Sequence, residues 1–227
     1  MNTIIIVIFS VVGGGFLFIL IYLFFIHDPT GERKKRRAAA LDKSAVFLRL
    51  STCFVATEKS LQTGLQQLAE NADTSTPEGQ WEVLRTALSL MTPSVDGATR
   101  VRFEVKDELS QAQSLSELEA AGIDLRSRFD EETIRTDEKG VRTQEATDED
   151  EEVAEFVVVS LVITFRGPRP QTTEVTNAFD LLGLLEDLLM LDMNRLLGIE
   201  IVWDPVSPDE ELTTRDLDEK YPDLVPM

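Results

Sequence analysis

The side chains that could do chemistry in this chain are few and poorly grouped. Cys53 is the single cysteine and His27 the single histidine. A thiol nucleophile needs a histidine or another activating group beside it, yet His27 ends one apolar segment and Cys53 lies inside another. We expect Cys53 to be a buried small apolar residue and His27 to be a polar cap. One cysteine also excludes an intramolecular disulfide, which agrees with a reducing compartment.

Carboxylates are the abundant reactive group, with 41 acidic against 22 basic side chains and a net charge of −19. A hydrolase could use a pair of them, but acid–base catalysis requires two carboxyl groups with separated pKa values in a water-poor cleft. The five consecutive acids at 148–152 lack the alternating ligands and the glycine of a calcium loop. Phosphate-loop, nucleophile-elbow and zinc-helix motifs are missing from the sequence. We therefore predict no cofactor and no metal, and we disfavour an enzyme.

An uncharged apolar run at 4–26 predicts a transmembrane helix over residues 3–26. A cleaved signal peptide would have basic residues before a shorter apolar stretch, whereas the basic cluster here follows the run, within a linker at 27–44. Because basic residues stay on the cytoplasmic side, we expect the N-terminus outside and the C-terminal domain in the cytoplasm, at the inner membrane. The residues expected to contact lipid headgroups are Arg33, Lys34, Lys35, Arg36 and Arg37.

Within the predicted span, Ser10 and Gly14 form a small-xxx-small pair that could support a weak homodimer. Small residues are common in single spans, and we favour the interpretation that this pair has no such role.

Residues 45–227 form one acidic domain of sufficient length to bury a core. Its charge argues against nucleic acid, whose phosphates require lysine and arginine. Either solubility or a basic partner could account for the acidity, and we favour solubility.

Hydrophobic periodicity predicts strands at 45–55, 101–105, 156–165 and 199–203, the third of them central because it is apolar on both faces. Helices are expected at 61–71, from Pro77 to a stop at Pro93, and from a cap at Thr176 to about residue 197, where Gly198 would terminate the helix. Short helices are expected within 110–135 and at 213–219, and a solvated acidic loop at 136–152. The order is β-α-α-β-α-β-α-β, an α/β or α+β fold with one sheet of about four strands packed by helices.

The segments Thr76-Pro77-Glu78-Gly79, 200–205 and Tyr221-Pro222-Asp223-Leu224 closely resemble the family known as domain of unknown function 1517 (DUF1517). The resemblance covers about residues 45–226 and implies a membrane-anchored bacterial member. It implies no activity, cofactor or catalytic residue, since the family has none agreed. Asp204 departs from the threonine common in the family's Trp-x-Pro turn, and Ser89-Leu90-Met91 lacks the usual arginine.

These features predict a non-catalytic interaction or regulatory module, with another membrane or cytoplasmic protein as its partner. The alternatives are a scaffold or assembly factor for a membrane complex and a carboxylate-based hydrolase. Trp203, Pro205, Tyr221 and Leu224 are the predicted partner contact, because tryptophan and tyrosine dominate interface energies where they are exposed. The competing interpretation, which we favour, is that these residues pin the C-terminal segment to the domain.

Overall fold

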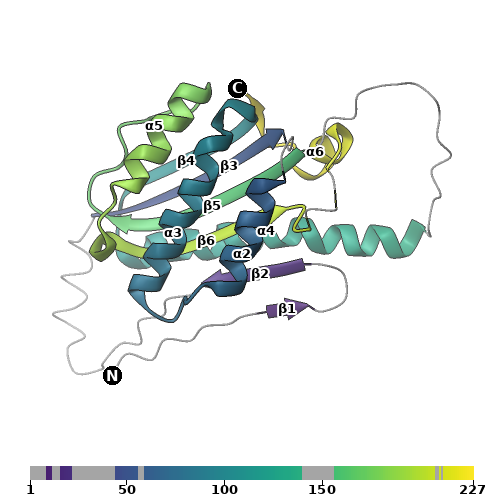
Figure 1. Ribbon diagram of the computed structural model, residues 1–227. Helices are drawn as coiled ribbons and strands as arrows, with labels where there is room; N and C mark the ends of the chain where they lie inside the picture. Colours follow the sequence, from purple (N-terminus) through teal and green to yellow (C-terminus); the bar gives the residue numbers. More distant parts are fainter. Residues whose placement is uncertain are drawn as a thin grey trace.

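The computed structural model describes residues 9–11, 16–21, 44–55, 59–139, 156–207, 210 and 212–227 (Figure 1). Its centre is an antiparallel sheet of four long strands: β3 (Ala45–Val55), β4 (Ala98–Leu109), β5 (Phe156–Arg166) and β6 (Leu196–Asp204). The spatial order is β6-β5-β3-β4, and β7 (Val225–Pro226) pairs with the outer edge of β4. Neighbouring strands are all antiparallel, so the fold is α+β.

Helices cover both faces of this sheet. Three of them, α2 (Ser60–Asn71), α3 (Pro77–Met91) and α5 (Ala178–Leu189), lie on one face, and α4 (Gln111–Lys139) crosses the other (Figure 1). A short helix, α6 (Thr214–Lys220), lies beside the sheet near the C-terminus. Two 3-10 turns, η2 (Thr92–Gly97) and η3 (Met193–Arg195), lead into β4 and β6.

Strand alternation gives the two faces different compositions. On β3, Val46, Leu48 and Leu50 point into the main core beneath α2, α3 and α5. The intervening residues, Phe47 and Arg49 among them, face α4. The central strands are buried along nearly their whole length, as predicted for 156–165. One face is therefore a hydrophobic core, and the other mixes apolar and charged side chains.

The start of α3 follows the predicted capping pattern, with one addition. Thr76 Oγ1 accepts a hydrogen bond of 3.0 Å from the Gly79 amide, and Pro77 occupies the first helical position. Gly79 stands where glutamate or glutamine would complete a capping box. A Cβ there would overlap the carbonyl oxygen of Asp73, so the preceding turn requires glycine.

Two helix predictions were wrong in extent. Residues 111–139 form the single helix α4, where short helices and the beginning of a loop were predicted. The helix α5 ends at Leu189 and is capped by Asn177, which accepts from the Asp180 amide; the predicted cap was Thr176 and the predicted end was near residue 197. Asp192 caps the following 3-10 turn and so interrupts the leucine-rich run. Gly198 lies inside β6, where a Cβ would meet Leu118 of α4.

The N-terminal segment contains two short strands within the span predicted as a transmembrane helix. They are β1 (Phe9–Val11) and β2 (Phe16–Ile21), and β2 pairs antiparallel with β6 through residues 19–21. Runs of branched and aromatic residues satisfy strand and helix preferences alike, which explains the difference. Ser10 lies in β1, while Gly14 and the basic cluster at 33–37 are outside the described residues, as are 140–152 of the predicted acidic loop. Among the helices that the structure describes, none is both long and apolar enough to cross a bilayer.

Replacing Gly79 by alanine tests the close approach at the start of α3. We expect Gly79→Ala to lower the free energy of unfolding by at least about 2 kcal/mol, because the backbone at Asp73 must move. The control is Gly183→Ala in α5, where a Cβ meets nothing within 4 Å and helix propensity should raise stability by up to about 1 kcal/mol. Urea denaturation of both variants measures the contrast, and equal effects would contradict it.

Candidate functional site

A polar layer occupies the sheet face beneath α4 and α6. Its members point away from the main core, and on β3, β5 and β6 they are interspersed with apolar residues such as Phe47, Val162 and Val202. The polar positions are Arg100, Arg102, Glu104 and Lys106 on β4, Arg49 and Ser51 on β3, Ser160 and Thr164 on β5, and Glu200 and Asp204 on β6. Arg49, Ser51, Ser160, Thr164, Glu200 and Asp204 are buried.

Asp223 links the C-terminal segment to this layer. Arg128 of α4 donates two hydrogen bonds to its carboxylate, Nη1 to Oδ1 at 2.7 Å and Nη2 to Oδ2 at 2.8 Å, and Arg102 of β4 donates a third. Burial opposes ionisation of Asp223, but the bonds from Arg128 and then Arg102 outweigh it and hold its pKa far below the ordinary value. The carboxylate therefore ties α4, β4 and the C-terminal segment together.

Arg49 is the buried cation of the layer. Its Nη2 lies 2.7 Å from Oδ2 of Asp124 on α4, and its Nε has no hydrogen-bond partner among the described residues. Burial lowers the pKa of Arg49, whereas the hydrogen bond to Asp124 raises it. Burial also opposes ionisation of Asp124, but the bond from Arg49 keeps the pKa of Asp124 low. The pair therefore stays charged and fastens α4 to β3.

Glu200 is the buried carboxylate of β6, with 4% of its side chain exposed. Arg126 Nη1 donates to its Oε1 at 2.8 Å, and Gly122 leaves room for the carboxylate beneath α4, where a Cβ would overlap it. Burial raises the pKa of Glu200 to about 7, and the charge of Arg126 offsets only part of that effect. This group changes its charge near neutral pH at the contact between α4 and the sheet.

Asp204 ends β6 and belongs to the same layer. Tyr221 donates its hydroxyl to Oδ2 of Asp204 at 3.1 Å, and Lys220 Nζ lies 3.6 Å from the same oxygen. The carboxylates of Asp124, Glu200, Asp204 and Asp223 thus each contact a cation. Carboxylates held in ion pairs of this kind can fasten helices to a sheet. A general acid or base, in contrast, must be able to exchange its proton with a substrate.

The predicted reactive groups do not converge. Cys53 is fully buried, as predicted, and burial raises the pKa of its thiol. His27 is outside the part of the chain that the structure describes. No group of three or more histidine, cysteine, aspartate or glutamate side chains could hold a metal ion in the described ranges.

The four residues predicted to contact a partner are buried and divided between the two faces. Trp203 packs into the main core, and Pro205 is buried after it with a cis peptide bond. Tyr221 and Leu224 pack with Cys53 in a separate cluster on the α4 side. Burial leaves these side chains little surface with which to touch another protein. The contacts of Tyr221 and Leu224 hold the C-terminal segment on the domain, and the partner contact at these four residues stays a prediction.

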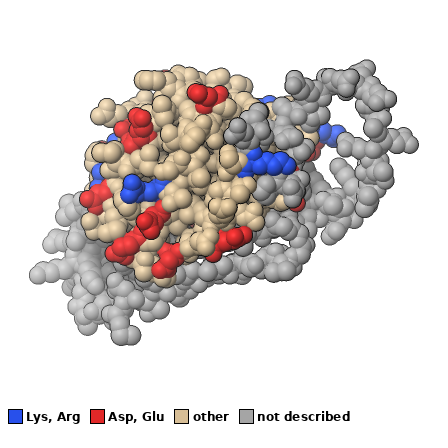
Figure 2. Space-filling model, in the orientation of Figure 1, with Lys and Arg blue, Asp and Glu red and all other residues tan. Residues whose placement is uncertain are grey.

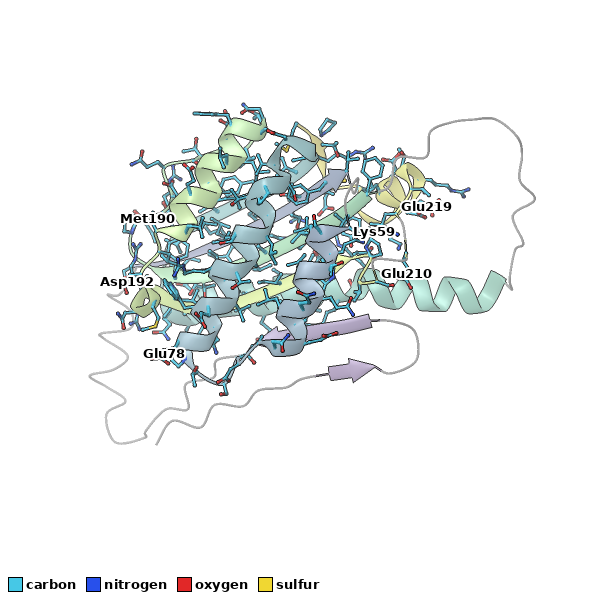
Figure 3. All side chains as sticks on the ribbon, in the orientation of Figure 1. Lys59, Glu78, Met190, Asp192, Glu210 and Glu219 are labelled. Atoms are coloured by element: carbon cyan, nitrogen blue, oxygen red, sulfur yellow. The ribbon has the colours of Figure 1, made fainter. Side chains whose placement is uncertain are left out.

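A hollow of about 170 Å³ lies at the C-terminal end of α5, and the sequence predictions did not include it. Its lining combines the loop after β5 with the end of α5 and η3: Phe165, Pro168, Arg169, Pro170, Gln171, Asp187, Leu188, Met190, Leu191 and Arg195. Arg195 stacks over the Phe165 ring and donates to the carbonyl of Arg166 at 2.6 Å. Met190 and Asp192 lie at this end of the molecule (Figure 3). In the sequence, only the Gly-Pro-Arg-Pro segment at 167–170 indicated an irregular loop at the position of this hollow.

A family model described as "Protein of unknown function (DUF1517)" matches residues 44–227. The chain belongs to the DUF1517 family. This membership confirms the resemblance drawn from the motifs at 76–79, 200–205 and 221–224.

Two curated relatives share moderate identity with the chain. FLUCTUATING-LIGHT-ACCLIMATION protein 1, chloroplastic, of Arabidopsis thaliana is 27% identical over 74% of this chain and 43% of its own length. Protein FLAP1 homolog A of Synechocystis sp. (strain ATCC 27184 / PCC 6803 / Kazusa) is 26% identical over 86% of this chain and 61% of its own length. The matches thus cover less than two thirds of either relative. No solved structure gives a significant match.

Glu200→Gln should change how stability depends on pH. The folded pKa of Glu200, about 7, exceeds the ordinary 4.5, so its contribution to stability is largest at low pH and falls as pH rises through this window. Relative to the variant, the free energy of unfolding of the wild type should fall by on the order of 3 kcal/mol as pH rises from 4.5 to about 7. Urea denaturation across that pH range measures it. Glu119→Gln, an exposed site on α4, is the control and should keep the wild-type profile.

Asp223→Asn should release the C-terminal segment. Removing the charge that three arginine hydrogen bonds share should lower the free energy of unfolding by about 2 kcal/mol at neutral pH. Because the folded pKa is depressed, the difference should shrink as pH falls below 3.8, where the unfolded carboxyl takes up its proton. Asp218→Asn, which removes an exposed ion pair with Arg100, should cost less than about 1 kcal/mol. Similar losses for both variants would contradict the role of Asp223.

Proposed function

We propose that this chain is a non-catalytic interaction module that acts in acclimation to changing light and is held at a membrane. The names of both relatives refer to light acclimation or to the FLAP1 protein, and neither name specifies an enzymatic reaction. One relative is chloroplastic and the other is cyanobacterial, which supports a role close to photosynthetic membranes. The domain itself would act by contact with a partner protein.

The observation that carries the interaction role is a contrast between the faces of the sheet. Beneath α4, charged groups such as Asp124, Glu200 and Asp223 form ion pairs within the domain. On the opposite side, Phe179 of α5 and Met190, which directly follows α5, are large apolar side chains that are almost completely exposed. Contiguous exposed apolar surface commonly marks an interaction site, and we propose that these two side chains belong to one.

The membrane attachment rests on the sequence of the first segment. Apolar residues at the centre of a helical span each contribute about −0.3 to −0.6 kcal/mol to insertion, and residues 4–26 carry no formally charged side chain. In comparison, β2 contacts β6 through only three residue pairs. We infer that residues 3–26 cross the bilayer when one is available and that the basic cluster at 33–37 holds the domain on the cytoplasmic side.

Complementation tests this function. In a Synechocystis strain whose homolog A gene is disrupted, this chain should restore growth under alternating strong and weak light and have little effect under constant light. A chimera with residues 1–37 replaced by an unrelated transmembrane span should also restore growth, because the segment is proposed only to tether. A truncated chain lacking residues 1–43 should leave the membrane fraction and fail to restore growth. Growth of the disrupted strain equal to that of its parent would remove light acclimation as the function.

A further inference from the structure

The outer face of α5 carries apolar side chains at helical spacing with nothing from the described chain packed over them. Phe179 is 83% exposed and Met190 85% exposed, and Leu182 is partly exposed between them. Positions 179, 182, 183, 186 and 190 share one side of the helix. The buried residues Leu181, Leu184, Leu185 and Leu188 line the opposite side.

One position in the middle of this face has no side chain. Gly183 lies between Phe179 and Met190, and a Cβ added to it would meet nothing within 4 Å. A glycine with open space above it lets the backbone of a second helix approach closely. The two exposed side chains are about three helical turns apart, and they would lie on either side of such a contact.

The charged side chains of α5 itself are all acidic, whereas the hollow beside it also contains Arg169 and Arg195. Within Ala178–Leu189 the charged side chains are Asp180, Glu186 and Asp187, and none is basic. Asp192 follows at the end where Met190 lies (Figure 3). In the view that faces α2, α3 and α5, acidic side chains and some basic ones surround a largely uncharged surface (Figure 2). The surface that matches α5 would be apolar with basic flanks.

The hollow extends the same face. Asp187 and Met190 line its edge, and Leu188 and Leu191 form part of its wall. A side chain from a partner could enter this space while the partner's backbone passes over Gly183. Buried anchors of this kind provide most of the affinity at protein interfaces.

We propose that the outer face of α5, together with the hollow at its C-terminal end, is the docking surface for a basic amphipathic helix of a partner protein. This inference rests on the proposed interaction role and specifies its surface and partner class. A second copy of the chain would bring two acidic helices together. An anionic lipid surface would be repelled by Glu186 and Asp187 for the same reason.

Binding of a designed helix tests the proposal. The probe is a fluorescent amidated peptide of leucine and lysine with its leucines on one face, and its leucine–glutamate counterpart is the charge control. The full chain is held in phosphatidylcholine nanodiscs, and empty nanodiscs supply the background. We expect Phe179→Ser/Met190→Ser to weaken binding of the lysine peptide at least tenfold and Glu186→Lys to weaken it several-fold with reduced salt dependence.

The matched control is Ile123→Ser on α4. Ile123 is also an exposed large apolar residue, at 56%, but it lies on the helix that covers the other face of the sheet. This variant should bind the lysine peptide within twofold of wild type. Equal losses at both sites, or equal binding of the glutamate peptide, would overturn the proposal. If the wild-type chain forms a dimer and the Phe179→Ser/Met190→Ser variant is monomeric, the proposal would be overturned in favour of self-association.

The two hypotheses can fail separately. If complementation succeeds and remains intact in Phe179→Ser/Met190→Ser, the function stands and the α5 surface is excluded. If the peptide binds at α5 while the disrupted strain grows normally in alternating light, the surface stands and light acclimation is excluded.

Discussion

The ladder between β3 and β5 determines most of what surrounds it. Ala45–Val55 and Phe156–Arg166 pair along eleven residues with continuous register, and both strands are buried on both faces. A strand buried on both faces needs a layer above and a layer below. The helices α2, α3 and α5 provide one layer and α4 the other, so the three-layer arrangement follows from the composition of two strands.

Because side chains alternate across the sheet, the same strands also carry the polar layer. The hydrophobic face packs without directional bonds, whereas the face beneath α4 is held by Arg49, Arg126 and Arg128 in specific ion pairs. Pairs of this kind fix orientation more than they add stability, because removing two charges from water is expensive. We interpret the layer as the feature that sets the position of α4 and the C-terminal segment on the sheet. The exposed face of α5 has no part in positioning α4 or the C-terminal segment.

The sequence predicted the strands well because each contains a dense run of branched and aromatic residues. Residues 45–55 form a strand with the predicted bounds, and 156–165 is central as expected. Pairing and direction were beyond reach, since helical connections allow parallel as well as antiparallel neighbours. The extent of α5 was missed because a leucine run continues into β6, and only the capping by Asp192 separates the two elements.

The polar layer could not be predicted, because its pairs join distant positions. Arg49 looks like an interruption in an apolar strand, and its partner Asp124 lies on a helix whose register against the sheet is unknown from sequence. The exposed face of α5 was within reach. A helical projection of residues 178–190 places Phe179 and Met190 opposite the buried leucines, and only the wrong helix end obscured it.

The order in which the chain is synthesised gives the central ladder a further consequence. Val55 pairs with Phe156 and Ala45 with Arg166, so partners are 101 to 121 residues apart. Closing such long loops is slow, and a growing chain must hold β3 with one edge open until β5 has left the ribosome. Since β4 appears first and pairs with the other edge of β3, the two strands can form a half-built sheet, as a folding intermediate, before β5 is synthesised. Such an intermediate exposes an unpaired apolar strand, the kind of surface that chaperones protect.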